Sequence, residues 1–142
     1  MTDHKEVRRT LVVATRRLGT LVADPSPAAP VAEAALEAME GLERILLAHF
    51  HAEEGEAGFF EELLRAAPQL SRDVDELRHQ HPVLAERIHS IVEGSRWAGL
   101  SDSAWRKVSV EFDRFVEEFT LHENTEDRLV AEGLMTDEGG LG

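Results

Sequence analysis

The 142-residue chain contains no cysteine, so disulfide bonds, thiolate metal ligands and thiol catalysis are excluded. It also has no tyrosine, which rules out chemistry that depends on a tyrosyl radical. Basic residues are scarce, because 15 Lys and Arg stand against 28 Asp and Glu and leave a net charge of −13. Nucleic-acid binding requires clusters of basic side chains, so this balance argues against DNA or RNA as a partner.

Long hydrophobic runs are missing as well. The apolar runs are far shorter than the ~20 residues that cross a bilayer. The first residues, MTDHKEVRRTL, lack the apolar stretch of a signal peptide. Hydrophobic residues still make up 42% of the chain, enough for the core of one domain. We therefore expect a single cytoplasmic domain over residues 1–142 that does not enter a membrane.

Proline and glycine divide the chain into four segments of helical length. The breaks are the proline-rich segment 24–30, the Ala67-Pro68 step and the segment 94–103, since both residue types interrupt helices. Four helices joined by short connections are typical of an all-α fold, an antiparallel up-down four-helix bundle. The predicted helices span about residues 3–23, 31–66, 71–93 and 102–134.

Each predicted helix carries an apolar stripe at 3–4-residue spacing, and each stripe is interrupted by histidine. In two of the stripes a glutamate follows the histidine one turn later. A buried imidazole or carboxylate without a partner is costly, so such residues on core-facing stripes indicate a bound metal ion. The six candidate ligands are His4, His49, Glu53, His81, His122 and Glu126.

The heights of these residues along the bundle can be compared by counting from each predicted turn. The counts bring the candidate ligands of the first three helices to nearly the same level. The fourth helix fits less well. His81 lies about 12 residues before the turn that joins the third and fourth helices, and His122 lies about 20 residues after that turn, a difference in height of ~12 Å. We expect the segment 94–101 to climb along the bundle axis and absorb this difference.

The ligand set is composed of nitrogen and oxygen donors. The spacing His-x-x-x-Glu, at His49/Glu53 and at His122/Glu126, places one donor of each kind on the same helix face. A sulfur-free set of this kind suits iron, with manganese or zinc as weaker alternatives. Because a carboxylate can bridge two ions, two glutamates favour a di-iron centre, oxo- or carboxylate-bridged, over a single ion.

In this arrangement the sequence resembles the hemerythrin-like, or HHE cation-binding, family over about residues 3–134. The resemblance implies a four-helix bundle with a non-haem di-iron centre between the helices. It further implies that the small ligand is O2, peroxide or NO, and that the role is sensing, binding or detoxification. The matching motifs are Asp3-His4, His49-x-x-x-Glu53-Glu54, Gln80-His81-Pro82-x-Leu84 and His122-Glu123-x-x-Glu126.

The chain departs from the oxygen-carrying members of that family at Leu77, where they have a further histidine. One ligand fewer implies an open coordination position for water, peroxide or another small molecule. Those members also tend to use His-x-x-x-x-Asp in the fourth helix. His122 and Asp127 satisfy this spacing, but Glu126 is in better register with the apolar stripe. The missing ligand could come from His79 or His89 if the third helix is rotated or bulged.

Further alternatives stay open at this stage. The chain could be a peroxide-consuming di-iron enzyme, or a bundle with one zinc ion or no metal that acts as an interaction module. Among the other polar residues, His51, His79 and His89 lie off the stripes and are expected to be solvated. Glu54 and Glu123 are expected to orient ligating histidines or to lie at the surface.

Overall fold

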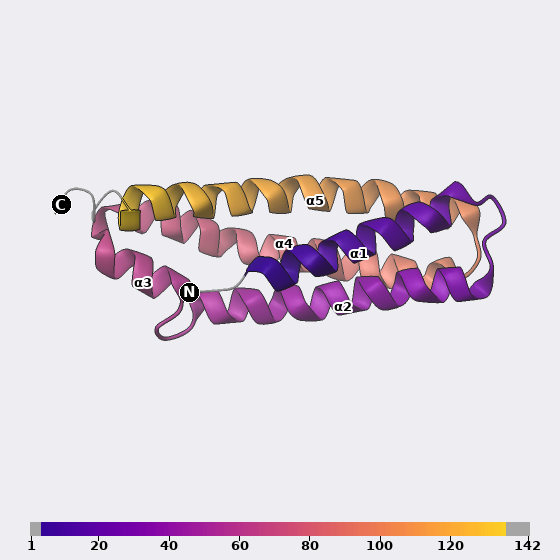
Figure 1. Ribbon diagram of the computed structural model, residues 1–142, viewed down its shortest axis with the longest axis horizontal. Helices are drawn as coiled ribbons and strands as arrows, with labels where there is room; N and C mark the ends of the chain where they lie inside the picture. Colours follow the sequence, from indigo (N-terminus) through magenta and orange to yellow (C-terminus); the bar gives the residue numbers. More distant parts are fainter. Residues whose placement is uncertain (1–3, 136–142) are drawn as a thin grey trace.

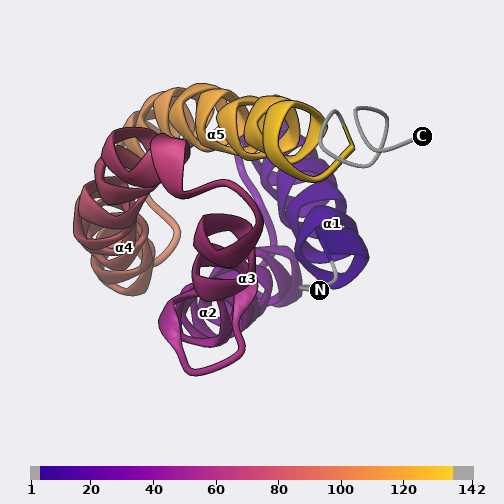
Figure 2. The same cartoon turned by 90° about the vertical axis from the view of Figure 1, so that its left-hand side faces the viewer.

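The computed structural model describes residues 4–135, so Asp3 of the first motif lies outside the described residues. Four long helices run alternately up and down, and a short helix, α3, lies across one end (Figure 1; Figure 2). Around the bundle α1 contacts α2, α2 contacts α4, α4 contacts α5, and α5 closes on α1. This confirms the predicted all-α four-helix bundle. The helices are α1 (His4–Ala23), α2 (Ala29–Glu54), α3 (Phe59–Ala66), α4 (Ser71–Ala98) and α5 (Asp102–Val130).

The prediction of one helix over residues 31–66 is wrong, because the chain leaves the helix after Glu54 and starts α3 at Phe59. Gly58 accounts for the break. A Cβ atom there would lie 2.3 Å from the carbonyl oxygen of Ala52 and 2.8 Å from that of Glu53. Only glycine can approach the end of α2 so closely, and this approach allows the chain to fold back over the end of the bundle.

The third helix is also longer than predicted, because α4 continues past residue 93 to Ala98 and ends at Gly99, whose φ is 57°. His81 therefore lies 17 residues before the end of α4, and His122 lies 20 residues after the start of α5 at Asp102. The height difference shrinks to ~5 Å. Residues 94–98 continue α4 along the bundle axis, so this segment does climb, as a helix, and absorbs most of the difference.

The other boundaries differ by smaller amounts. Pro30 lies in the first turn of α2, where its missing N–H is not needed, so that helix begins at Ala29. A short 3₁₀ helix, η1 (Pro68–Leu70), connects α3 to α4. The predicted fourth helix, 102–134, is α-helical only to Val130 and continues as a π-helical turn, η2 (Ala131–Met135).

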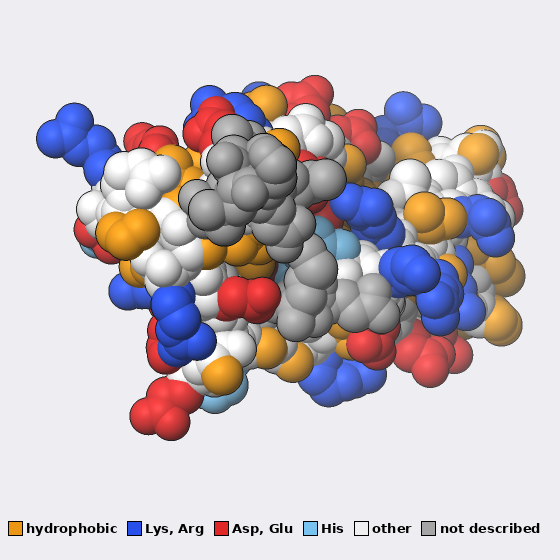
Figure 3. All heavy atoms as spheres, turned by 60° about the vertical axis from the view of Figure 1, so that its left-hand side comes forward, with side chains coloured by type: hydrophobic (Ala, Val, Ile, Leu, Met, Phe, Trp, Pro, Cys, Tyr) orange, Lys and Arg blue, Asp and Glu red, His pale blue; other side chains and the backbone are white. Residues whose placement is uncertain are grey.

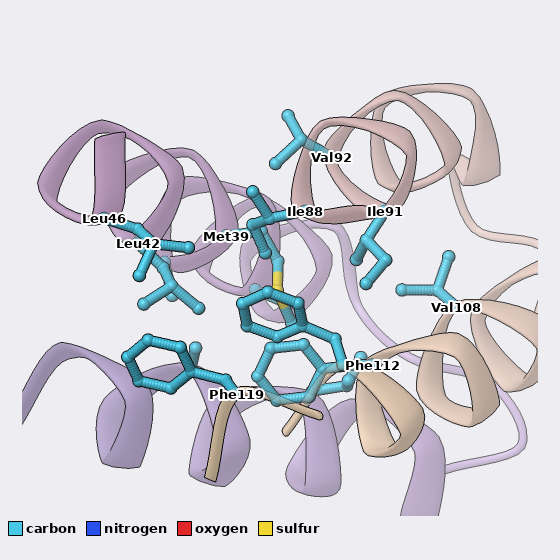
Figure 4. Close-up of a cluster of buried hydrophobic side chains, with 14 of the residues drawn as sticks. Met39, Leu42, Leu46, Ile88, Ile91, Val92, Val108, Phe112 and Phe119 are labelled. Atoms are coloured by element: carbon cyan, nitrogen blue, oxygen red, sulfur yellow. The ribbon is translucent and has the colours of Figure 1, made fainter. Parts of the chain in front are cut away.

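Two apolar clusters fill the interior. The larger one joins α1, α2, α4 and α5, and in the view of Figure 4 its side chains point toward one another from three of these helices. The smaller one lies beneath α3 and includes Phe60, Leu77 and Leu129. Along α4, Leu77 of the smaller cluster and Leu84 of the larger one flank His81. The polar stripe residues therefore lie where the two clusters meet. The side chains labelled in Figure 4 are Met39, Leu42, Leu46, Ile88, Ile91, Val92, Val108, Phe112 and Phe119.

The outer surface carries charges of both signs. Acidic and basic side chains are interspersed on the face shown in Figure 3. Charged side chains form ion pairs between helices, including Arg87 with Glu118 at 2.7 Å and Arg96 with Glu40 at 2.9 Å. Among residues 4–135, no helix combines the length and apolar character that a membrane span requires.

Candidate metal site

Each of the four long helices contributes one histidine to a single buried site, and all four histidines turn Nε2 toward two carboxylates. His49 Nε2 lies 3.5 Å and His81 Nε2 3.2 Å from Oε1 of Glu53. From α5, His122 Nε2 lies 3.6 Å from Oε1 of Glu126. At the start of α1, His4 Nε2 lies 3.8 Å from Oε2 of Glu53 and 4.0 Å from Oε1 of Glu126. The structure thus brings all six predicted ligands together.

Their donor atoms form two groups that could each hold a metal ion. In each group the donor atoms lie within 4.8 Å of one another. Glu53 belongs to both groups, and its side chain is completely buried. The shared carboxylate could therefore contribute a donor to either group. The first group consists of His4, His49, Glu53 and Glu126, and the second of Glu53, His81 and His122.

Most of these donor atoms have no other partner within the described part of the chain. Seven buried side-chain atoms lack a hydrogen bond there, and six of them belong to the candidate ligands. Unpartnered polar atoms of this number are rare in a folded core because each one is costly. Closely grouped nitrogen and oxygen donors fit a cation, so these residues could hold a metal ion. The six atoms are both carboxylate oxygens of Glu53 and of Glu126, Nε2 of His81 and Nε2 of His122.

The electrostatics of the two carboxylates also favour a cation. Burial raises the pKa of Glu126, and the neighbouring Glu53 carboxylate raises it further. Burial alone would raise the pKa of Glu53 too, but its contacts with His4, His81 and Glu126 lower that pKa below its usual range. Two interacting buried carboxylates do not both ionise readily, so Glu126 keeps a proton while Glu53 is ionised. A bound cation would replace that proton.

The histidines are perturbed in opposite directions. Contacts with Glu123 and Glu53 raise the pKa of His4 to about 9. Burial lowers the pKa of His49, and burial together with the charge of His81 lowers the pKa of His122 to about 4. The imidazoles of His49 and His122 are therefore neutral at pH 7, which is the state in which histidine binds a metal.

Three of the histidines direct the outward nitrogen, Nδ1, to an acceptor. His81 Nδ1 donates to Glu54 at 2.8 Å, and His122 Nδ1 donates to Oε1 of Gln80 at 2.7 Å. His4 Nδ1 lies 3.3 Å from Glu123. The sequence left the roles of Glu54 and Glu123 open between such contacts and the surface, and the structure places both against histidines. The sequence gave no reason to assign a role to Gln80, because its contact with His122 on α5 depends on how the helices pack.

Apolar rings surround the second donor group. Phe50 and Phe60 both stack on the ring of His81, with centroid distances of 4.0 Å and 5.2 Å. Phe119 stacks near His122 at 6.3 Å. These rings restrict the motion of the imidazoles and keep water away from the donor atoms, which strengthens their interaction with a cation.

The remaining polar candidates lie away from the site. Asp127 points to the surface, where its side chain is 61% exposed and 4.0 Å from Arg8, whereas the Glu126 side chain is 1% exposed. His79 is exposed and donates to the backbone oxygen of Asp75. His89 is likewise exposed and contacts the half-buried Glu43. Neither of these two histidines belongs to the donor groups, and Leu77 is buried among apolar side chains.

Comparison of the chain with known protein families, with curated proteins and with solved structures finds no match in any of the three. The function is therefore inferred from the chemistry of the site.

Proposed function

We propose that the chain is a non-haem di-iron protein of the hemerythrin-like type and that it binds a small oxidant or gas. The small ligand would be O2, peroxide or NO, and the role would be sensing, binding or detoxification. One observation carries the proposal, namely that Glu53 belongs to two groups of metal-ligand atoms at once. Two groups of donors that share one carboxylate support two ions rather than one.

The donor groups differ in size. The first offers four residues, with His4, His49 and Glu126 beside Glu53. The second offers three, with His81 and His122 beside the same glutamate. Iron ordinarily accepts more donors than three, so the smaller group leaves room for an additional ligand. When bound, iron supplies open coordination positions and a change of oxidation state, and both suit an oxidant or a gas.

The residues of the chain have separable tasks in this scheme. Glu53 and Glu126 offset the positive charge of the metal ions, and the imidazoles supply neutral nitrogen donors. Phe50 and Phe60 keep the second group dry and narrow, which favours a small ligand over a larger one. The nitrogen and oxygen donor set supports iron, but manganese and zinc also accept it.

The experiment that tests this proposal is elemental analysis of the chain purified from iron-replete cells. We expect about two irons per chain, together with the near-ultraviolet and visible absorption of ferric iron. Addition of NO or peroxide should alter that absorption. A chain that contains one zinc ion, or no metal, would contradict the proposal and favour an interaction module.

Catalysis can be separated from binding in the same preparation. If the iron-loaded chain consumes peroxide repeatedly, with gas evolved in excess of the protein, it is a peroxide-consuming enzyme. If the absorption changes once and returns when the ligand is removed, it is a binder or a sensor. The matched control is a chain in which Glu53 is replaced by glutamine, which loses an oxygen donor shared by both groups.

A further inference from the structure

The two histidines of the second donor group have unlike partners behind them. His81 donates from Nδ1 to the carboxylate of Glu54, whereas His122 donates from Nδ1 to the carboxamide oxygen of Gln80. The two imidazole rings lie only 5.0 Å apart. The His81 ring therefore donates a hydrogen bond to a negatively charged group, and the His122 ring donates one to a neutral group.

The contact with Gln80 determines which nitrogen of His122 faces the site. Oxygen can only accept, so at 2.7 Å the proton belongs to Nδ1 and the lone pair of the neutral ring is on Nε2. Nε2 lies 3.6 Å from Oε1 of Glu126 and makes no hydrogen bond there. Within residues 4–135, Nδ1 thus has an acceptor for its proton, whereas Nε2 has no hydrogen-bond partner.

Gln80 lies at a position where solvent could replace it. It forms part of the wall of a groove of about 460 Å³ between α4 and α5, and His122 lines the same groove. Val83 and Leu121 give this groove an apolar edge. Without the carboxamide, Nδ1 of His122 would face the groove and its water, and nothing in the described part of the chain would fix the proton on that nitrogen.

We propose that Gln80 is a positioning residue that commits His122 to present Nε2 to the metal and makes it a weaker donor than His81. A carboxylate acceptor increases the electron density of the imidazole that it backs, and a neutral carboxamide does so less. The second metal ion is then held by two imidazoles of unequal strength. This inference rests on the proposed metal-binding function.

Zinc and cobalt serve as probes, with three variants of the full chain. Gln80→Leu removes the acceptor, and Gln80→Glu gives His122 the same kind of partner as His81. Glu76→Leu is the matched control, because Glu76 is an exposed residue one turn earlier on α4 that lines the same groove. Zinc affinity is measured by competition with a chromophoric chelator, and the visible absorption of the cobalt form reports on donor strength.

We expect Gln80→Leu to weaken binding of the second zinc ion roughly 10–100-fold, the usual effect of losing a group that orients a ligand. Gln80→Glu should restore binding to at least the original affinity and shift the visible bands of cobalt. Glu76→Leu should change neither. Original affinity in Gln80→Leu, or an unshifted cobalt spectrum in Gln80→Glu, overturns the proposal. If Gln80→Leu does not fold, the cobalt spectrum of Gln80→Glu decides.

Nitrogen-detected NMR of the chain without metal tests Gln80 independently of the proposed iron function. The ring signals of His122 are assigned by their loss in His122→Asn. We expect the proton on Nδ1 in the original chain and no longer confined to Nδ1 in Gln80→Leu. A proton on Nε2 in the original chain contradicts the role of Gln80. A chain that shows the expected proton but never acquires iron contradicts the proposed function alone.

Discussion

Oε1 of Glu53 lies 3.2 Å from Nε2 of His81, so the last turn of α2 reaches across the core to the middle of α4. The same oxygen lies 3.5 Å from Nε2 of His49. No hydrogen bond within the described part of the chain satisfies either oxygen of this carboxylate. One buried group therefore links the two donor groups, and its removal should affect both.

The first prediction concerns that link. Glu53→Gln should remove most or all of the bound metal from both groups, because a neutral amide does not offset the charge of a cation. Metal content per chain, measured by elemental analysis, checks this. Glu62→Gln on α3 changes an exposed glutamate in the same way and should leave the metal content at its original value. Loss of only one metal ion from Glu53→Gln would show that this residue serves one group alone.

The second prediction distinguishes two neighbouring acids of α5. Glu126→Ala should lower the metal content, because its side chain is 1% exposed and its carboxylate faces His122. Asp127→Ala should leave the metal content unaltered, because that side chain is 61% exposed and points toward Arg8. The two variants are analysed in one preparation. An empty site in Asp127→Ala with a full one in Glu126→Ala would reverse the assignment of the ligand.

The third prediction is that metal binding releases protons. Contact with Glu123 and Glu53 raises the pKa of His4 to about 9, so His4 is protonated at pH 7.5 in the metal-free chain. The raised pKa of Glu126 keeps a second proton in the site. Both must leave when a cation is bound. Zinc titration in a weak buffer with a pH indicator should show this release, and His4→Gln should release fewer protons.

The fourth prediction is the pH dependence of stability without metal. The pKa of His4 is about 9 in the folded chain against 6.5 for an ordinary histidine, so the folded state binds more protons between these values. The contribution of His4 is fully present below pH 6.5 and is lost as the pH rises through 9. Urea midpoints measured with a chelator present should fall over this range. A His4→Gln chain should show a shallower fall, and an identical slope would refute the assignment to His4.

The fifth prediction tests the turn that ends α2. Gly58→Ala should destabilise the fold by about 1–3 kcal/mol, because the added Cβ lies 2.3 Å from the carbonyl oxygen of Ala52 and something must shift. Gly55→Ala is the matched control in the same turn, since its Cβ would meet ordinary contacts of 3.5 Å or more. Urea unfolding of both variants gives the comparison. Equal stabilities would show that the turn opens easily.

The sequence alone was sufficient for the architecture. Apolar side chains at 3–4-residue spacing have to be buried on one face of a helix, and proline and glycine mark where helices stop. These local effects predicted the four-helix bundle. They failed at residues 55–58, because the break after Glu54 depends on Gly58 packing against carbonyl oxygens of α2. They also predicted that the third helix ends at residue 93. In the structure α4 continues through Gly94 to Ala98, because it packs against α5.

The candidate metal site was likewise predictable in part from the sequence and in part only from the tertiary structure. The sequence selected the six candidate ligands because a histidine or glutamate on a buried stripe needs a partner, and this follows from spacing along one helix at a time. Only the packing of the helices decided the rest. It placed Glu53 within reach of His4 and His81 on two other helices, and it turned Asp127 outward while Glu126 faces inward. Contacts such as that between Gln80 and His122 depend on the rotation of each helix against its neighbours, which no pattern within one helix encodes.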